Sequence, residues 1–198
     1  VQDCRRAAEL SKADLLTGIV GEFPTLQGLM GGEYAKHDGE SPVVSAAIRE
    51  QYMPRAMEGE LPESLAGKVL SLADRLDSIA GFFLVGMVPS GSEDPFALRR
   101  HATAIVRIVI ESKLRLNLAQ AVRTAQEVLS AQDVIAAPQT GKGGTPDIIG
   151  FLFERVRFYG KSAHQVRDDV MEAVLKSADR QTLDLTDLFD KMKALQQV

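Results

Sequence analysis

Residues 62–83, PESLAGKVLSLADRLDSIAGFF, carry the pattern that decides the fold class. Apolar side chains recur every three or four residues along this stretch, which is the spacing of one face of an α-helix. The members of this apolar stripe are Leu65, Val69, Leu72, Leu76, Ile79 and Phe83. The pattern predicts a long amphipathic helix. No stretch of the sequence shows the period-two alternation that is typical of a β-strand.

Further helices are predicted on both sides of this stretch from their periodicity and capping signals. Before it, helices are expected over residues 3–20 and 25–34, the second weakened by glycines, and from Ser41-Pro42 to Tyr52. After it, Asp94-Pro95 is expected to begin a helix that reaches residue 112, and Asn117 to cap one that reaches residue 130. The last helices are expected over residues 146–159, 162–177 and 186–196, with Thr186 and Asp187 as candidate caps. The predicted fold class is therefore all-α.

The predicted domain boundary is the segment Ala136 to Thr145, AAPQTGKGGT, which is rich in glycine and small polar residues. We expect one helical domain over residues 1–135 and an appended helical segment over residues 146–198. The string around Lys142 resembles part of a phosphate-binding loop. It lacks the Gly-Lys-Ser/Thr order and a preceding strand, so a flexible linker is favoured.

Composition excludes several classes of protein. The 198 residues are 45% apolar and 25% charged, which is typical of a globular protein. The single cysteine, Cys4, cannot form an internal disulfide, and this fits a reducing, cytoplasmic compartment. No apolar run reaches the roughly 20 residues that a membrane span needs. The chain begins Val1-Gln2-Asp3 without a methionine or a secretory leader, so we expect an excised fragment of a soluble protein.

Charge is distributed unevenly although the net charge is only −4. Residues 1–95 carry a net −7, residues 96–167 a net +6, and residues 168–198 a net −3. The basic middle includes Arg99, Arg100 and Arg107, followed by Lys113 and Arg115. Arginine forks suit phosphate oxygens, so this segment is a candidate phosphate-contacting face. Salt bridges to the acidic N-terminal segment are the alternative.

Few residues suggest catalysis. His37-Asp38 is compatible with a metal-dependent phosphohydrolase, in which a His-Asp doublet and a distant aspartate such as Asp74 or Asp77 hold the metal. No histidine precedes residue 37 to complete the ligand set. Asp74 and Asp77 also suit acid–base catalysis, although ion pairing with arginines is the more frequent role for such carboxylates.

Several strings, taken in order, resemble the β subunit of bacterial glycyl-tRNA synthetase. They are KADLLT (12–17), VGEFPTLQG (20–28), GGEYAKHDGE (31–40), QYMPR (51–55), LADRLD (72–77), PSGS (89–92) and DPFALRR (94–100). Their order and spacing match this family over roughly residues 5–115, which corresponds to the central part of the subunit. The remaining residues are too loosely patterned to be placed by motif.

The resemblance implies an α/β heterotetramer that joins glycine to tRNA(Gly) with ATP, in which the α subunit holds the aminoacylation site and the β subunit chiefly binds tRNA. It also implies a helical domain like that of HD phosphohydrolases, with a degenerate metal site. Lys12-Ala13-Asp14 then stands where those enzymes have the His-Asp doublet, and Asp74 or Asp77 where they have the distant aspartate. On this alignment His37-Asp38 has no catalytic role.

We therefore expect a catalytically inactive fragment, without a metal or cofactor of its own, that supports tRNA binding and subunit architecture. Arg99, Arg100 and Arg107 are the candidate tRNA-binding residues, through contacts with the backbone that do not depend on sequence. Two alternatives remain: an active HD-type phosphohydrolase, and a purely structural scaffold that docks the α subunit or other β-subunit domains.

Overall fold

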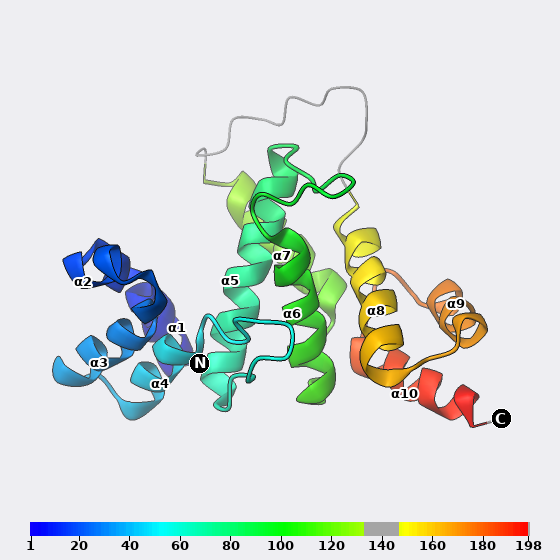
Figure 1. Cartoon of the computed structure of the whole chain (residues 1–198), viewed down its shortest axis with the longest axis horizontal. Helices are drawn as coiled ribbons and strands as arrows, with labels where there is room; N and C mark the ends of the chain where they lie inside the picture. Colours follow the sequence, from blue (N-terminus) through cyan, green and yellow to red (C-terminus); the bar gives the residue numbers. More distant parts are fainter. Residues whose placement is uncertain (133–146, 198) are drawn as a thin grey trace. The chain divides into compact units, whose positions relative to one another are not determined.

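The computed structural model describes residues 1–132 and 147–197, and in these residues it has ten α-helices, two short 3-10 helices and no β-strand (Figure 1). This confirms the predicted all-α class. None of the described helices is long and apolar enough to span a membrane. The chain divides into two compact units, Val1–Asp74 and Arg75–Val198, with the boundary inside helix α5 (Leu65–Leu84). This division differs from the predicted one, whose linker 136–145 lies outside the described residues.

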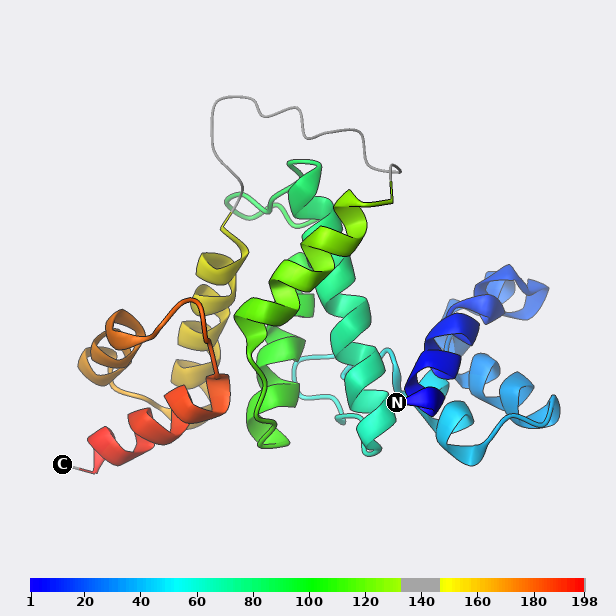
Figure 2. The same ribbon diagram turned by 180° about the vertical axis from the view of Figure 1, so that it is seen from behind.

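The first unit is built around helix α4. Its other elements are α1 (Gln2–Leu10), η1 (Ala13–Leu16), α2 (Gly18–Glu22), η2 (Pro24–Leu26), α3 (Leu29–His37) and the part of α5 up to Asp74. Helix α4 (Pro42–Glu50) contacts both α1 and α3 (Figure 2), and Ser41 caps it as predicted, accepting a hydrogen bond from Val44 N–H at 3.2 Å. The buried core of this unit contains Ala7, Ala35, Val44, Ala47, Ile48, Ala66 and Leu70.

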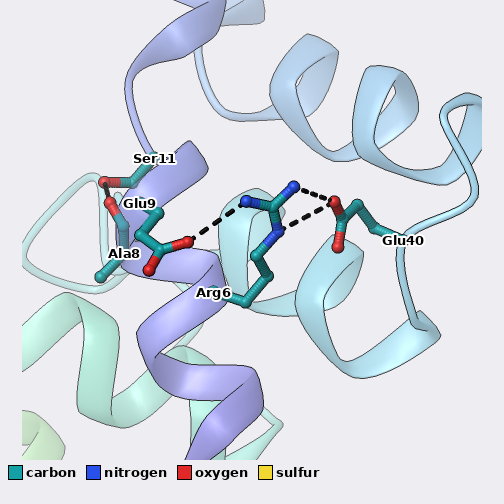
Figure 3. A network of polar contacts seen from close by, with 5 residues as sticks. All are labelled: Arg6, Ala8, Glu9, Ser11 and Glu40. Atoms are coloured by element: carbon teal, nitrogen blue, oxygen red, sulfur yellow. Dashed lines mark hydrogen bonds and ion pairs between the residues drawn. The ribbon is translucent and has the colours of Figure 1, made fainter.

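Helix α1 is held at its sides and at its end by polar contacts. Arg6 donates to Glu40 Oε1 from Nε and Nη2, at 3.0 and 2.6 Å, and from Nη1 to Glu9 Oε2 at 3.2 Å (Figure 3). These contacts tie α1 to the turn before α4. At its C-terminal end Ser11 Oγ donates to the carbonyl of Ala8 at 2.8 Å, a local bond that competes with continued helix.

The single helix predicted over residues 3–20 is wrong. The chain leaves α1 at Ser11, and Lys12 adopts a left-handed conformation with φ of 67°, which no residue of a right-handed helix has. Two short elements, η1 and α2, follow in place of the rest of that helix. This break turns Asp14 into the interior, where it is 1% exposed. The predicted helix over residues 3–20 included Asp14 and did not anticipate this turn.

The second unit is centred on helix α6 (Leu98–Glu111). Every residue of α6 from Ala102 to Ile110 is buried, so this part of the helix is enclosed on all sides. It contacts α8 (Ile148–His164) and α10 (Leu185–Gln196), and α9 (Asp168–Ser177) contacts both of these helices. The segment after residue 146 therefore shares a core with α6, which explains why the compact units do not separate at the predicted linker. Helix α7 (Leu118–Ser130) has the predicted bounds and its predicted Asn117 cap.

Several predicted helix ends in this unit move for identifiable reasons. Helix α6 begins at Leu98 rather than Pro95, because Ala97 is left-handed with φ of 55° and cannot belong to the helix. Asp94 Oδ1 accepts from Leu98 N–H at 2.7 Å. Asp184, rather than Thr186 or Asp187, caps α10. Thr186 Oγ1 instead donates to the carbonyl of Leu114 at 2.8 Å. Helix α8 continues past its predicted end to Gln165, which is left-handed and ends it.

Candidate functional site

The predicted phosphate-contacting arginines of helix α6 differ in exposure to solvent. Arg100 lies in the first turn of the helix, is exposed, and has no hydrogen-bond or ion-pair partner among the described residues. Its neighbour Arg99 donates from Nη2 to the carbonyl of Gly91 at 2.8 Å and from Nη1 to that of Glu93 at 3.2 Å. Arg99 therefore holds the loop before α6, while Arg100 offers an unpaired guanidinium to solvent.

Arg107 is placed differently from these two residues. It is 8% exposed, and its Nε lies 2.7 Å from Glu111 Oε1, which also accepts from the hydroxyl of Tyr159 at 2.8 Å. Burial acts to raise the pKa of Glu111, but the hydrogen bonds from Arg107 and Tyr159 outweigh it and hold that pKa below its ordinary value. Arg107 thus joins α6 to α8 through Glu111, and its guanidinium is not displayed beside that of Arg100.

The other two cations named in the basic segment, Arg115 and Lys113, also differ in their surroundings. Arg115 Nε lies 2.8 Å from Asp184 Oδ2, so its charge is compensated within the second unit. Lys113 is exposed directly after α6, in a left-handed conformation. The alternative of a salt bridge to the acidic N-terminal segment is therefore wrong for Arg115, whose partner belongs to the C-terminal acidic segment.

The structure brings together most of the positions that the HD comparison singles out. Lys12 Nζ lies 2.5 Å from Asp74 Oδ1, so an ammonium group stands against the distant aspartate. Asp14 Oδ2 accepts from the backbone N–H groups of Gly28 at 2.6 Å and Gly31 at 3.1 Å, and in this way caps helix α3 from a distant part of the chain. Asp77 is exposed and belongs to the second unit.

The ring of Tyr52 completes the cluster around Asp14. Burial, together with the nearby carboxylates of Asp14 and Asp74, raises the pKa of the Tyr52 hydroxyl to about 12. Gly28 has φ of +79°, and a Cβ there would lie 2.7 Å from the Tyr52 ring, so only glycine fits this close approach. Each polar group named here therefore has an evident role in packing η1, α3 and the end of α4 together.

His37 and Asp38 contact each other rather than a shared site. His37 Nδ1 lies 3.1 Å from Asp38 Oδ1 at the end of α3, and both side chains are largely exposed. Across residues 1–132 and 147–197, no three His, Cys, Asp or Glu side chains are grouped closely enough to hold a metal ion. The described residues therefore do not form the set of metal ligands that a metal-dependent phosphohydrolase needs. The phosphate-loop-like string around Lys142 lies outside the described residues.

One surface feature was missed by the sequence reasoning. Beside Arg99, the loop residues Met87, Val88 and Phe96 leave large apolar side chains exposed, by 52%, 39% and 41%. They line a hollow of about 290 Å³. Phe96, the aromatic residue after Asp94-Pro95, was the signal in the sequence for this exposed apolar surface. The predicted helix that begins at Asp94-Pro95 placed Phe96 in its first turn instead.

Comparison with known proteins decides the family. The sequence profile described as "Glycyl-tRNA synthetase beta subunit" matches residues 1–176, which include every string quoted above. The chain belongs to the glycyl-tRNA synthetase β-subunit family. It is 45% identical over 195 residues to the glycine–tRNA ligase β subunit of Clostridioides difficile, covering 98% of this chain and 27% of that protein. It is 44% identical over 191 residues to that of Lactiplantibacillus plantarum, covering 96% and 27%.

A third member of the family, from Geobacter sp. strain M21, is 44% identical over 174 residues, which are 88% of this chain and 24% of that protein. The chain therefore spans about a quarter of the length of the curated relatives that it matches. Membership applies to nearly the whole of this chain, and the family resemblance predicted for residues 5–115 is confirmed and extended beyond them.

Proposed function

We propose that the chain is a tRNA-contacting and architectural part of a glycine–tRNA ligase β subunit. In this proposal it acts in the cytoplasm with an α subunit, as part of a heterotetramer that uses ATP to join glycine to tRNA(Gly). Family membership supports the assignment to this enzyme, since the relatives carry that name. The chain itself contributes binding and shape, and ATP and glycine are handled by the other parts of the enzyme.

The observation that carries tRNA contact is the unpaired guanidinium of Arg100 at the start of α6. It is exposed in the first turn of the helix, within a segment of net charge +6. Arg99 positions the adjoining loop through its carbonyl contacts. Arg107 is proposed to act indirectly, by holding α6 against α8. Contacts of this kind give salt-dependent affinity with little sequence preference.

The proposal is tested by Arg100→Gln in the purified chain, with fluorescence anisotropy of labelled tRNA(Gly) over a salt series. Loss of one phosphate contact is expected to weaken binding several-fold and to reduce the slope of log affinity against log salt by about one. Arg5→Gln is the matched control, because Arg5 is also exposed without a partner among the described residues, in the acidic first unit. Absence of salt-dependent binding by the unaltered chain, or equal effects of the two substitutions, would overturn the proposal.

We also propose that the HD-like site around Lys12, Asp14 and Asp74 is degenerate and serves packing. The Lys12 ammonium against Asp74 supports this, because it supplies there the positive charge that a bound cation provides in an active site. The competing phosphohydrolase hypothesis is tested by a phosphodiester assay with added Mn²⁺. Turnover that Asp74→Asn abolishes, while Asp77→Asn does not, would contradict the proposed degenerate role.

A further inference from the structure

The exposed apolar residues before α6 form a surface that the proposed arginine contact leaves unexplained. We call Met87, Val88 and Phe96 the apolar shelf. All three belong to the loop between α5 and α6, and they line the hollow of about 290 Å³ together with Pro89 and Leu98. Exposed apolar side chains that cluster in this way mark binding sites more often than isolated ones do.

The Phe96 ring is held in place from behind. It stacks on Phe82 of α5, with ring centroids 4.1 Å apart and an angle of 21° between the ring planes. Two rings at this distance and angle are in parallel contact through one face of each. Since Phe96 is still 41% exposed, a flat group can extend the stack from the solvent side. The conformational cost of ordering Phe96 is met before any ligand arrives.

The loop around the shelf is also ordered by contacts of its own. Arg99 binds the carbonyls of Gly91 and Glu93, and Glu93 N–H donates to the carbonyl of Ser90 at 2.9 Å. The Asp94 carboxylate accepts from the N–H groups of Leu98 and Arg99, at 2.7 and 3.0 Å. The hollow is therefore a built feature, joined directly to the turn of α6 that carries Arg100.

Size and charge select the class of group that fits the shelf. A hollow of about 290 Å³ is at the lower end of the range of ligand pockets, roughly 300–1,000 Å³, and suits one flat ring system rather than the face of a helix. Glu93 and Asp94 also line it, so a phosphate inside would be repelled, whereas base amino groups can donate to carboxylates. The cation at Arg100 is available for the phosphate that accompanies such a base.

We propose that the apolar shelf stacks one unpaired nucleotide of the bound RNA on Phe96, while Arg100 neutralises its backbone. The inference rests on the proposed tRNA contact and adds the nature of the nucleotide, which must be unstacked because a base inside a duplex is covered on both faces by its neighbours. Base stacking on an aromatic side chain tolerates any base, so the subsite selects unpaired structure rather than sequence.

The experiment uses the whole chain and a single-stranded RNA of about eight nucleotides that carries one 2-aminopurine, compared with the same RNA in a duplex. Phe96→Leu removes the aromatic face and keeps an apolar side chain, and Phe96→Tyr keeps the ring. Phe23→Leu is the matched control, because Phe23 is 51% exposed in the first unit. Circular dichroism establishes that each variant is folded.

The expected result is that Phe96→Leu weakens single-strand binding by about five-fold to one hundred-fold and abolishes quenching of 2-aminopurine fluorescence. Phe96→Tyr and Phe23→Leu should leave both quantities close to those of the unaltered chain, and duplex binding should not change in any variant. If Phe96→Leu proves unstable, the quenching of 2-aminopurine fluorescence decides the question. Phe96→Tyr keeps the aromatic ring, so the proposal requires that this variant still quenches the fluorescence.

Two contrary results are distinguishable. If Phe96→Leu binds and quenches like the unaltered chain while Arg100→Gln binds more weakly, the nucleotide subsite is refuted and the tRNA contact stands. The shelf would then be assigned to a protein partner if Phe96→Leu weakened binding of the α subunit. If the unaltered chain binds tRNA(Gly) but neither short RNA, the subsite fails and the tRNA contact stands; if it does not bind tRNA(Gly) either, the proposed function fails with it.

Discussion

Replacing Gly31 with alanine tests the packing that encloses Asp14. A Cβ at this position would lie 2.9 Å from Ile48 Cγ2 and 3.2 Å from Asp14 Cγ, so at least one neighbour must move. Helix propensity opposes this effect, because alanine is better than glycine inside a helix by about 1 kcal/mol. The outcome therefore depends on whether the packing cost exceeds the propensity gain.

The structure indicates that the packing cost is larger. Overpacking a core typically costs about 1–3 kcal/mol. Ile48 is 1% exposed and Asp14 is also buried, so neither can swing into solvent. Moving α3 away instead lengthens the bond from Gly31 N–H to Asp14 Oδ2, now 3.1 Å, and a bond to a charged group contributes about 1.5–3 kcal/mol. We expect Gly31→Ala to lower the free energy of unfolding of the first unit by about 2 kcal/mol after the propensity gain.

Amide hydrogen exchange over residues 28–37 measures this change locally, which a global melt of two compact units does not. An opening that is about 2 kcal/mol easier should accelerate exchange roughly thirty-fold. Gly21→Ala is the matched control, since a Cβ there meets nothing within 4 Å, and it should be neutral or slightly stabilising. If Gly31→Ala exchanged no faster than the unaltered chain, the close packing of Asp14, Ile48 and α3 would be refuted.

Three further predictions concern buried polar groups. Asp14→Asn should destabilise the first unit by about 1–2 kcal/mol in urea unfolding, because the bonds from two backbone N–H groups lose their charged acceptor. Asp77→Asn, at an exposed position, should change the free energy of unfolding by no more than about 0.5 kcal/mol. Equal effects of the two substitutions would contradict the capping role of Asp14. The pKa of Glu111 is lowered in the folded state, so its stabilisation is present above its ordinary pKa of 4.5 and is lost as the pH falls through the folded value. Glu111→Gln should therefore flatten this acid loss in thermal melts, and an unchanged slope would count against the Arg107–Glu111–Tyr159 network. Burial and, to a lesser extent, Lys193 lower the pKa of His164, so an NMR titration should give a midpoint below 6.5, and a midpoint above 6.5 would contradict this environment.

Much of the fold was predictable from local signals. Ser41 and Asn117 cap the helices that follow them because a side-chain oxygen reaches an N–H group only two or three residues away. The long α5 helix follows from its apolar stripe for a similarly local reason. Predictions were wrong where a distant partner decides the outcome. The first predicted helix ends before Asp14, whose carboxylate is buried against the N-terminus of α3, seventeen residues further along the chain at Gly31.

The candidate site divides in the same way. Charge counting located the basic segment and its arginines, because net charge is a property of the sequence. It did not distinguish Arg100 from Arg107, which are seven residues apart and fall on similar sides of an ideal helix. Only the packing of α8 against α6 buries Arg107 beside Glu111 and Tyr159.

The sequence by itself therefore determined the all-α class, several of the capped helices, the charge distribution and the family, all of which depend on neighbouring residues or on residue order. Tertiary structure decided which polar groups are buried as partners and which remain at the surface. It alone pairs Lys12 with Asp74, encloses Arg107, and stacks the ring of Phe96 on that of Phe82. The physical reason is that burial and ion pairing arise between segments far apart in the chain, so no local pattern encodes them.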